Sequence, residues 1–149
     1  MDQLNLPPAA LKLRSAGGKT EVWDIVRRRY IALTPEEWVR QHFVHFLINE
    51  KTVPASLIAI EVSLKYNRMS KRCDILVYDR QGMPLIIVEC KAPGVNISEE
   101  AFMQVAMYNM TLKVPYLVVT NGMNQYICII DHHKKSYSFL EEIPQYTEL

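Results

Sequence analysis

The sequence lacks any run of about 18 apolar residues, which is the length that a membrane-spanning helix needs. It also lacks the charged start followed by an apolar stretch that is typical of a secretory signal peptide. Cysteine is scarce, and Cys73, Cys90 and Cys128 show no C-x-x-C spacing, so neither zinc nor a disulfide framework is predicted. We therefore expect three free thiols in a cytoplasmic protein that has no contact with a membrane.

Excess charge of either sign is also missing, because 17 Lys and Arg residues balance 16 Asp and Glu residues to a net charge of +1. No strong overall field would attract nucleic acid, so any DNA contact must come from local patches. The length of 149 residues fits one domain with a single core. Residues 1–19 show no sustained period and are predicted to form a loosely structured lead-in to one domain over residues 20–149.

The most informative stretch runs from Arg72 to Lys91, where two apolar, β-branched-rich runs flank a turn that contains Gly and Pro. This composition predicts a β-hairpin. Three charged residues, Asp74, Glu89 and Lys91, interrupt these otherwise apolar strands, and alternation places Glu89 and Lys91 on the same side. Burying unpaired charge is unfavourable, so these groups form either a salt bridge or a metal site with a lysine beside it.

The remaining pattern predicts helices and further strands around this hairpin. Thr34 caps a helix that begins at Pro35 and ends near residues 49–51, and Ser98 caps a second helix that runs to about Leu112. Residues 21–31 indicate an edge strand or short hairpin, and residues 66–71 a polar connector. Further strands are expected at 57–64, 116–120, 125–131 and 136–140. This order predicts an α/β fold, with a three-layer core in which helices flank a mixed β-sheet.

The Asp74 strand followed by Glu89-Cys90-Lys91 resembles the motif of the PD-(D/E)xK nuclease superfamily, with Cys73 in place of the usual proline. The expected core is then restriction-endonuclease-like. The resemblance implies that Asp74 and Glu89 hold Mg²⁺ or Mn²⁺, helped by the backbone carbonyl of Cys90. It also implies that Lys91 orients the attacking water. Mg²⁺ is a hard cation that prefers such oxygen ligands.

A second motif, Gln104-x-x-x-Tyr108, lies on the predicted second helix, where residues four apart share one face. It resembles the branch that includes exonuclease domains of recombination enzymes and the N-terminal nuclease domain of the type I restriction motor subunit. There the motif supports the active site and contacts nucleic acid. The chain has no P-loop, helicase motif or target-recognition domain, so by itself it is not a complete ATP-driven restriction subunit.

The resemblance also implies a glutamate on the first helix that reaches the metal site. Glu37 is the candidate because Glu37-x-x-Arg40-Gln41 is the form that this helix takes in the relatives it most resembles, and Glu36 is the alternative. Both acids could instead only complement the positive end of the helix dipole. The densest basic patch near the acids, formed by Lys65, Arg68, Lys71 and Arg72, either holds DNA or is a solvated turn.

The hypothesis is therefore a Mg²⁺-dependent deoxyribonuclease domain that hydrolyses DNA phosphodiesters, related to the N-terminal domains of type I restriction enzymes. The expected partners are DNA, a helicase, translocase or other restriction or repair chain, and a second copy of this chain. One alternative is a nuclease-like fold that serves only as a nucleic-acid-binding or assembly module. The other alternative is a plain structural domain, in which the charged residues form salt bridges.

Overall fold

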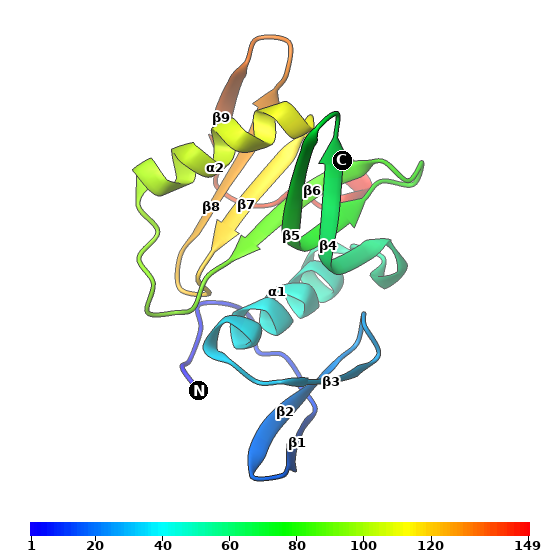
Figure 1. Ribbon diagram of the computed structural model, residues 1–149, viewed down its shortest axis with the longest axis vertical. Helices are drawn as coiled ribbons and strands as arrows, with labels where there is room; N and C mark the ends of the chain where they lie inside the picture. The colour runs from blue at the N-terminus through cyan, green and yellow to red at the C-terminus, as the bar shows by residue number, and fades with distance from the viewer.

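The computed structural model describes all residues from 1 to 149. It contains a small three-stranded sheet, a larger six-stranded sheet and two long helices (Figure 1). In chain order the elements are β1 (Leu13–Ala16), β2 (Lys19–Asp24), β3 (Arg29–Ala32), α1 (Pro35–Lys51), β4 (Ile58–Tyr66), β5 (Met69–Tyr78), β6 (Pro84–Cys90), α2 (Glu99–Leu112), β7 (Tyr116–Thr120), β8 (Gln125–Asp131) and β9 (Ser136–Leu140), with short 3-10 turns at Ala55–Leu57 and Tyr146–Glu148.

Both helices begin where the capping residues predict. The Thr34 hydroxyl accepts a hydrogen bond from the Glu37 N–H at 3.0 Å, and the Ser98 hydroxyl accepts one from the Ala101 N–H at 3.0 Å. These bonds satisfy backbone donors that have no partner within the first turn of a helix. α1 ends at Thr52, whose left-handed backbone stops the helix.

The six-stranded sheet follows the order β4-β5-β6-β7-β8-β9. Every neighbouring pair is antiparallel except β6 and β7, which run parallel in the register Ile86↔Tyr116 to Cys90↔Thr120. Parallel neighbours need a crossover connection, and α2 supplies it. The predicted mixed sheet is confirmed.

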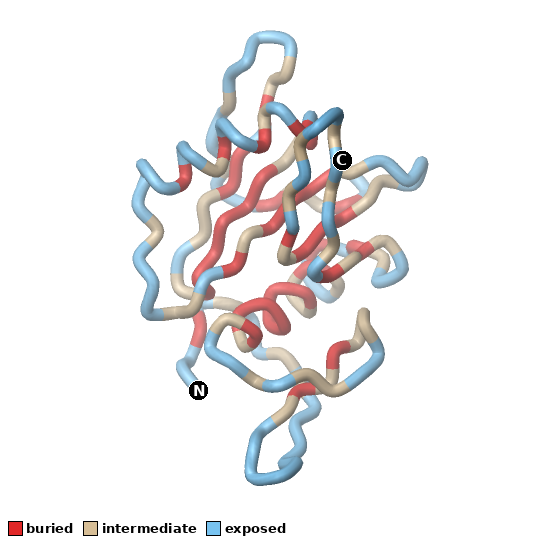
Figure 2. The backbone as a smooth tube through the Cα atoms, in the orientation of Figure 1, coloured by how far each residue is buried: buried red, intermediate tan, exposed pale blue.

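Side chains on the two faces of this sheet form two separate cores. α1 packs Val39, Phe43 and Leu47 against one face, and α2 packs Phe102 and Ala106 against the other. The central strands are therefore buried on both sides, as the burial colouring in Figure 2 shows. Continuous apolar runs are what strands covered on both faces require. The three predicted layers are α1, the sheet and α2 (Figure 1).

Two segments differ from the expectation from sequence. Residues 66–71 are not a connector, because β4 and β5 continue through them and only Asn67 and Arg68 form the turn. Asn67 has a left-handed φ of 55°, a conformation that asparagine tolerates better than most residues. The early segment also contains more order than a loose lead-in, since β1 pairs with β2 and Leu4 is buried.

The three cysteines are free and buried, as predicted. Burial raises the pKa of Cys73 and of Cys128 to about 11 and raises that of Cys90 further above its usual range. No helix is long and apolar enough to cross a membrane.

Candidate functional site

Asp74 and Glu89 lie close together on the neighbouring strands β5 and β6. The pairing of the two strands reaches Ile75 opposite Val88, and Asp74 and Glu89 are the next residues along each strand. The negative charge of Asp74 is close enough to Glu89 to raise the pKa of that carboxyl. The two acids that the sequence singles out are therefore neighbours, although a long stretch of chain separates them.

Asp74 sits where the sheet departs from regular alternation. Cys73 belongs to the α2-side core and Ile75 to the α1-side core, whereas a regular strand would place them on one face. On the neighbouring strand, Glu61 has a left-handed φ of 51° at the matching position. Such irregularities next to functional sites re-aim side chains, and here the irregularity frees Asp74 from the ladder.

The Asp74 carboxylate is anchored at one oxygen only. Oδ2 accepts a hydrogen bond of 2.7 Å from the Cys90 N–H on β6. A charge-assisted bond of this kind is short and directional. It fixes the carboxylate beside the backbone of the Glu89-Cys90-Lys91 segment and leaves Oδ1 free for another partner.

Glu89 is half-buried, and Lys71 is its partner. The Lys71 ammonium forms an ion pair with Glu89 Oε1. Burial raises the pKa of Glu89 above its usual range, and the negative charge of Asp74 adds to this rise, while Lys71 and Lys91 offset it in part. The two lysines therefore balance the charge of the two carboxylates, and burial is the main reason why the pKa of Glu89 is raised.

Lys91 occupies a position distinct from that of Lys71. Its side chain is exposed, while its backbone N–H donates to the Thr120 carbonyl at 2.8 Å and extends the pairing of β6 with β7. Its charge is close enough to Glu89 to lower the pKa of that carboxyl. Two lysines thus flank Glu89, and the sequence pattern pointed to one of them.

Gln104 and Tyr108 of α2 border the same site from above the sheet. Together with Lys71 and Arg72 they line an open groove of about 400 Å³. The Tyr108 hydroxyl donates to the Ser70 carbonyl at 2.9 Å, and the Lys71 ammonium lies 5.5 Å from the centre of the Tyr108 ring. Tyr108 therefore braces Lys71, the residue that contacts Glu89, while Gln104 is exposed in the groove.

Glu37 is bonded to arginines, and its role in a metal site with Asp74 and Glu89 stays a prediction. No group of three or more His, Cys, Asp or Glu side chains in the chain is arranged to hold a metal. Glu37 is buried on α1 and pairs with Arg27 at 3.0 Å and Arg40 at 3.3 Å. Glu36, the alternative, is half exposed and lies 3.5 Å from Arg40. A buried carboxylate needs such partners, and the arginines supply them.

This buried ionic network connects the small sheet to the site and was not predicted. Arg27 also bonds to Asp24 at 2.6 Å, and Arg40 reaches Glu61 at 3.1 Å. Glu61 lies on β4 next to the position of Asp74 on β5. Burial alone would lower the pKa of Arg40, but the negative charges of Glu37 and Asp74 outweigh burial and raise it. The sequence has three consecutive arginines at residues 27–29, but it does not indicate the partners of Arg27, because the network joins residues that are distant in the chain.

The residues of the predicted basic patch have different partners. Lys71 contacts Glu89, whereas Arg72, the next residue of the strand, bonds to Glu61 at 3.2 Å, although both border the same groove. Lys65 and Arg68 are exposed near the β4–β5 turn. These separate partners follow from the strand structure of residues 69–72, where the sequence pattern predicts a connector.

The chemistry of the donor set fits one divalent cation. Asp74 accepts a hydrogen bond through Oδ2, Glu89 is paired with Lys71, and the negative charge of Asp74 raises the pKa of Glu89. Mg²⁺ is often held by one or two carboxylates and keeps several waters, so a larger acid cluster is not needed. Asp74 and Glu89 are the residues that could hold it.

Residues 35–144 match the family described as the type I restriction enzyme R protein N terminus (HSDR_N). The chain belongs to this family. Its fold is also similar to that of a fragment described as an HsdR subunit of a type I restriction enzyme from Vibrio vulnificus YJ016, with 21% identity and a TM-score of 0.55. That likeness covers 80% of this chain and 25% of the other. Comparison with curated protein sequences finds no match.

The HSDR_N match spans α1, the whole six-stranded sheet and α2, so it includes every residue of the candidate site. The small sheet of β1–β3 lies before the matched region. The fold and the family predicted from the Asp-Glu-x-Lys and Gln-x-x-x-Tyr motifs are confirmed.

Proposed function

We propose that this HSDR_N-family chain is a metal-dependent deoxyribonuclease module that hydrolyses DNA phosphodiester bonds. The observation that carries the proposal is the proximity of Asp74 and Glu89 on the neighbouring strands β5 and β6, with Lys71 and Lys91 close to Glu89. Two neighbouring carboxylates favour a bound cation, and the two lysines favour a phosphate.

Asp74 and Glu89, with the backbone carbonyl of Cys90, are the groups that would hold Mg²⁺ or Mn²⁺. When bound, the metal supplies Lewis-acid polarisation of the phosphate and lowers the pKa of a coordinated water. Lys91 orients the attacking water and stabilises the negative charge that develops on the phosphate. Its exposed side chain can reach solvent and substrate.

The groove residues position the strand. Lys71 neutralises Glu89 in the free protein and can turn to a phosphate when a cation takes its place on Glu89. Tyr108 and Gln104 border this groove, where they brace Lys71 and contact the DNA. Lys65 and Arg68 hold the backbone of the DNA further along the β4–β5 hairpin.

A second candidate function is a nuclease-like module that binds DNA or a helicase or translocase chain without cleaving DNA. One observation favours it, namely that Lys71 already occupies the position beside Glu89 that a cation would need. In that case the Lys71–Glu89 pair is structural and DNA contacts come from the exposed hairpin alone.

A metal titration followed by thermal melting tests the site without a substrate. Selective binding to the folded state raises stability by about 2.7 kcal/mol at a metal concentration 100 times Kd. We expect Mg²⁺ and Mn²⁺ to raise the Tm of the wild type and to have little effect on Asp74→Asn or Glu89→Gln.

Cleavage is then measured on linear, nicked and single-stranded DNA with the same proteins. The expected result is metal-dependent cleavage that is lost in Asp74→Asn, Glu89→Gln and Lys91→Met. Glu142→Gln, which changes an exposed acid outside the site, is the matched control. A metal-induced shift in Tm without cleavage of any DNA would support the binding module instead.

A further inference from the structure

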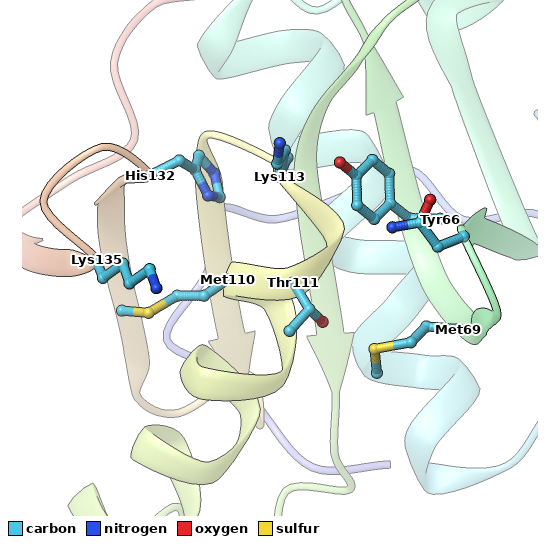
Figure 3. Close-up of a pocket in the computed structure, with 8 residues that line it drawn as sticks. Tyr66, Met69, Met110, Thr111, Lys113, His132 and Lys135 are labelled. Carbon is cyan, nitrogen blue, oxygen red and sulfur yellow. The ribbon is translucent and has the colours of Figure 1, made fainter.

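A second cavity, separate from the acid pair, lies at the far end of α2. It has a volume of about 500 Å³ and is enclosed by three parts of the chain, namely the tip of the β4–β5 hairpin, the last turn of α2 and the turn between β8 and β9. Figure 3 shows side chains from all three converging on it. Neither of the two sequence motifs reaches this region.

The walls of this cavity are apolar and its rim is basic. Tyr66, Met69 and Met110 supply the apolar surface, while Lys113 and Lys135 supply charge. None of the lining residues is acidic, so neither lysine has a carboxylate partner within the cavity. The Lys113 ammonium lies 5.3 Å from the centre of the Tyr66 ring, so an aromatic surface and a cation stand side by side.

This pairing fits a nucleotide that is not base-paired. Its flat base would contact the aromatic ring and the methionine side chains, as bases do on the stacking platforms of single-strand-binding proteins. Its phosphate would meet Lys113 and Lys135. A base held within a duplex exposes no stacking face to such a cavity, so double-stranded DNA fits it poorly.

The cavity also continues the groove beside the acid pair. The groove is bordered by Lys71 on β5 and Tyr108 on α2, and the cavity by Met69 on β5 and Met110 on α2, so the two follow the same seam. From Asp74 to Met69, β5 spans about 17 Å at roughly 3.4 Å per residue. That length matches about five stacked nucleotides at roughly 3.4 Å each.

We propose that this cavity holds an unpaired nucleotide of a single DNA strand whose scissile phosphate lies at Asp74 and Glu89. The inference deepens the proposed nuclease function, on which it rests, by assigning single-stranded or frayed DNA as the substrate class. The strand follows the seam between β5 and α2, and the cavity selects against fully paired DNA.

Binding of fluorescent thymidine oligonucleotides to the full chain in EDTA tests the proposal without cleavage. Affinity should rise with the length of the oligonucleotide until about five nucleotides extend beyond the Asp74–Glu89 pair. A duplex of equal length should bind more weakly. Lys113→Gln combined with Lys135→Gln should lower the slope of log affinity against log salt by about 1.4, at roughly 0.7 per lost contact. Lys19→Gln combined with Lys134→Gln removes the same charge outside the cavity and should leave the slope unchanged.

Tyr66→Leu tests the stacking wall and should weaken single-strand binding by about 5- to 150-fold while leaving duplex binding unchanged. Thermal melting shows whether this variant is folded, and the lysine pair tests the cavity independently if it is not. Equal single-strand affinity for wild type and the Lys113/Lys135 variant would overturn the proposal, as would tighter binding of duplex than of single strands. Cavity-dependent binding without metal-dependent cleavage would support the cavity and contradict the nuclease function.

Discussion

Lys71 of β5 forms an ion pair with Glu89 of β6, although the motif that identifies the site contains Lys91 instead. The two lysines differ in burial, since Lys71 is mostly covered and Lys91 is exposed. Lys71 competes with a cation for the Glu89 carboxylate, whereas Lys91 leaves Glu89 accessible. Neutral substitution of Lys71 should therefore change the metal affinity, whereas neutral substitution of Lys91 should not.

We expect Lys71→Met to bind Mg²⁺ more tightly than the wild type, because its Glu89 carboxylate loses a competing cation. In EDTA the same variant should be less stable, since a buried carboxylate without its partner costs several kcal/mol. Lys91→Met should change neither the metal affinity nor the stability much, but should abolish cleavage. Isothermal titration with Mg²⁺ and urea unfolding in EDTA measure both quantities, and equal metal affinity for all three proteins would contradict the competition.

Asp74 should tolerate asparagine much better than alanine. Asparagine keeps an oxygen for the Cys90 N–H and removes the charge that repels Glu89, so we expect Asp74→Asn to match or exceed wild-type stability in EDTA. Asp74→Ala leaves the Cys90 N–H without its acceptor, which costs about 1–3 kcal/mol. Urea unfolding measures the stability of both variants. A loss of about 3–5 kcal/mol in the free energy of unfolding of Asp74→Asn would instead indicate that the fold needs the charge of Asp74.

Asp24 should make the fold sensitive to acid. Burial alone would raise its pKa, but hydrogen bonds from the Arg27 backbone, the Arg27 guanidinium and Gln41 outweigh this and lower it. A lowered pKa contributes stability above the pKa of the unfolded chain, about 3.9, and this contribution is lost as pH falls through the lower folded value.

The wild type should therefore be more stable than Asp24→Asn at neutral pH, and the difference should shrink as pH falls below about 4. Urea unfolding between neutral and acidic pH measures this difference. Asp2→Asn, at an exposed position, is the control and should follow the wild type at every pH. A difference between wild type and Asp24→Asn that does not change with pH would mean that folding does not shift the pKa of Asp24.

The hairpin tip should bind DNA backbone without regard to strandedness. Lys65 and Arg68 are exposed there, and each lost phosphate contact on duplex DNA should lower the salt slope by about 0.9. We expect Lys65→Gln combined with Arg68→Gln to lower the slope for duplex and single strands alike. Fluorescence anisotropy against salt measures it, with Lys19→Gln and Lys134→Gln as the charge-matched control. An unchanged slope of log affinity against log salt would mean that Lys65 and Arg68 are solvated and do not contact DNA.

The sequence by itself determined the two capped helices, the order of the main helices and strands along the chain, and the family. Thr34-Pro35 and Ser98 define helix starts through local hydrogen bonds, and apolar runs such as Leu85–Val88 define strands buried on both faces. These signals are local, so they can be read without knowing which elements pack against one another in the folded protein. The Asp74 and Glu89-Cys90-Lys91 spacing was informative for the same reason, because a hairpin brings neighbouring strands together in register.

Only the tertiary structure decided which charges meet. Lys71 reaches Glu89 because β5 begins at Met69 and not after a connector, and Glu37 of α1 meets Arg27 from the segment between β2 and β3. The cavity between the β4–β5 hairpin, α2 and the β8–β9 turn likewise joins segments that no sequence period relates. Ion pairs and cavities depend on distances between elements, and those distances are set by packing across the sheet and not by the spacing of residues along the chain.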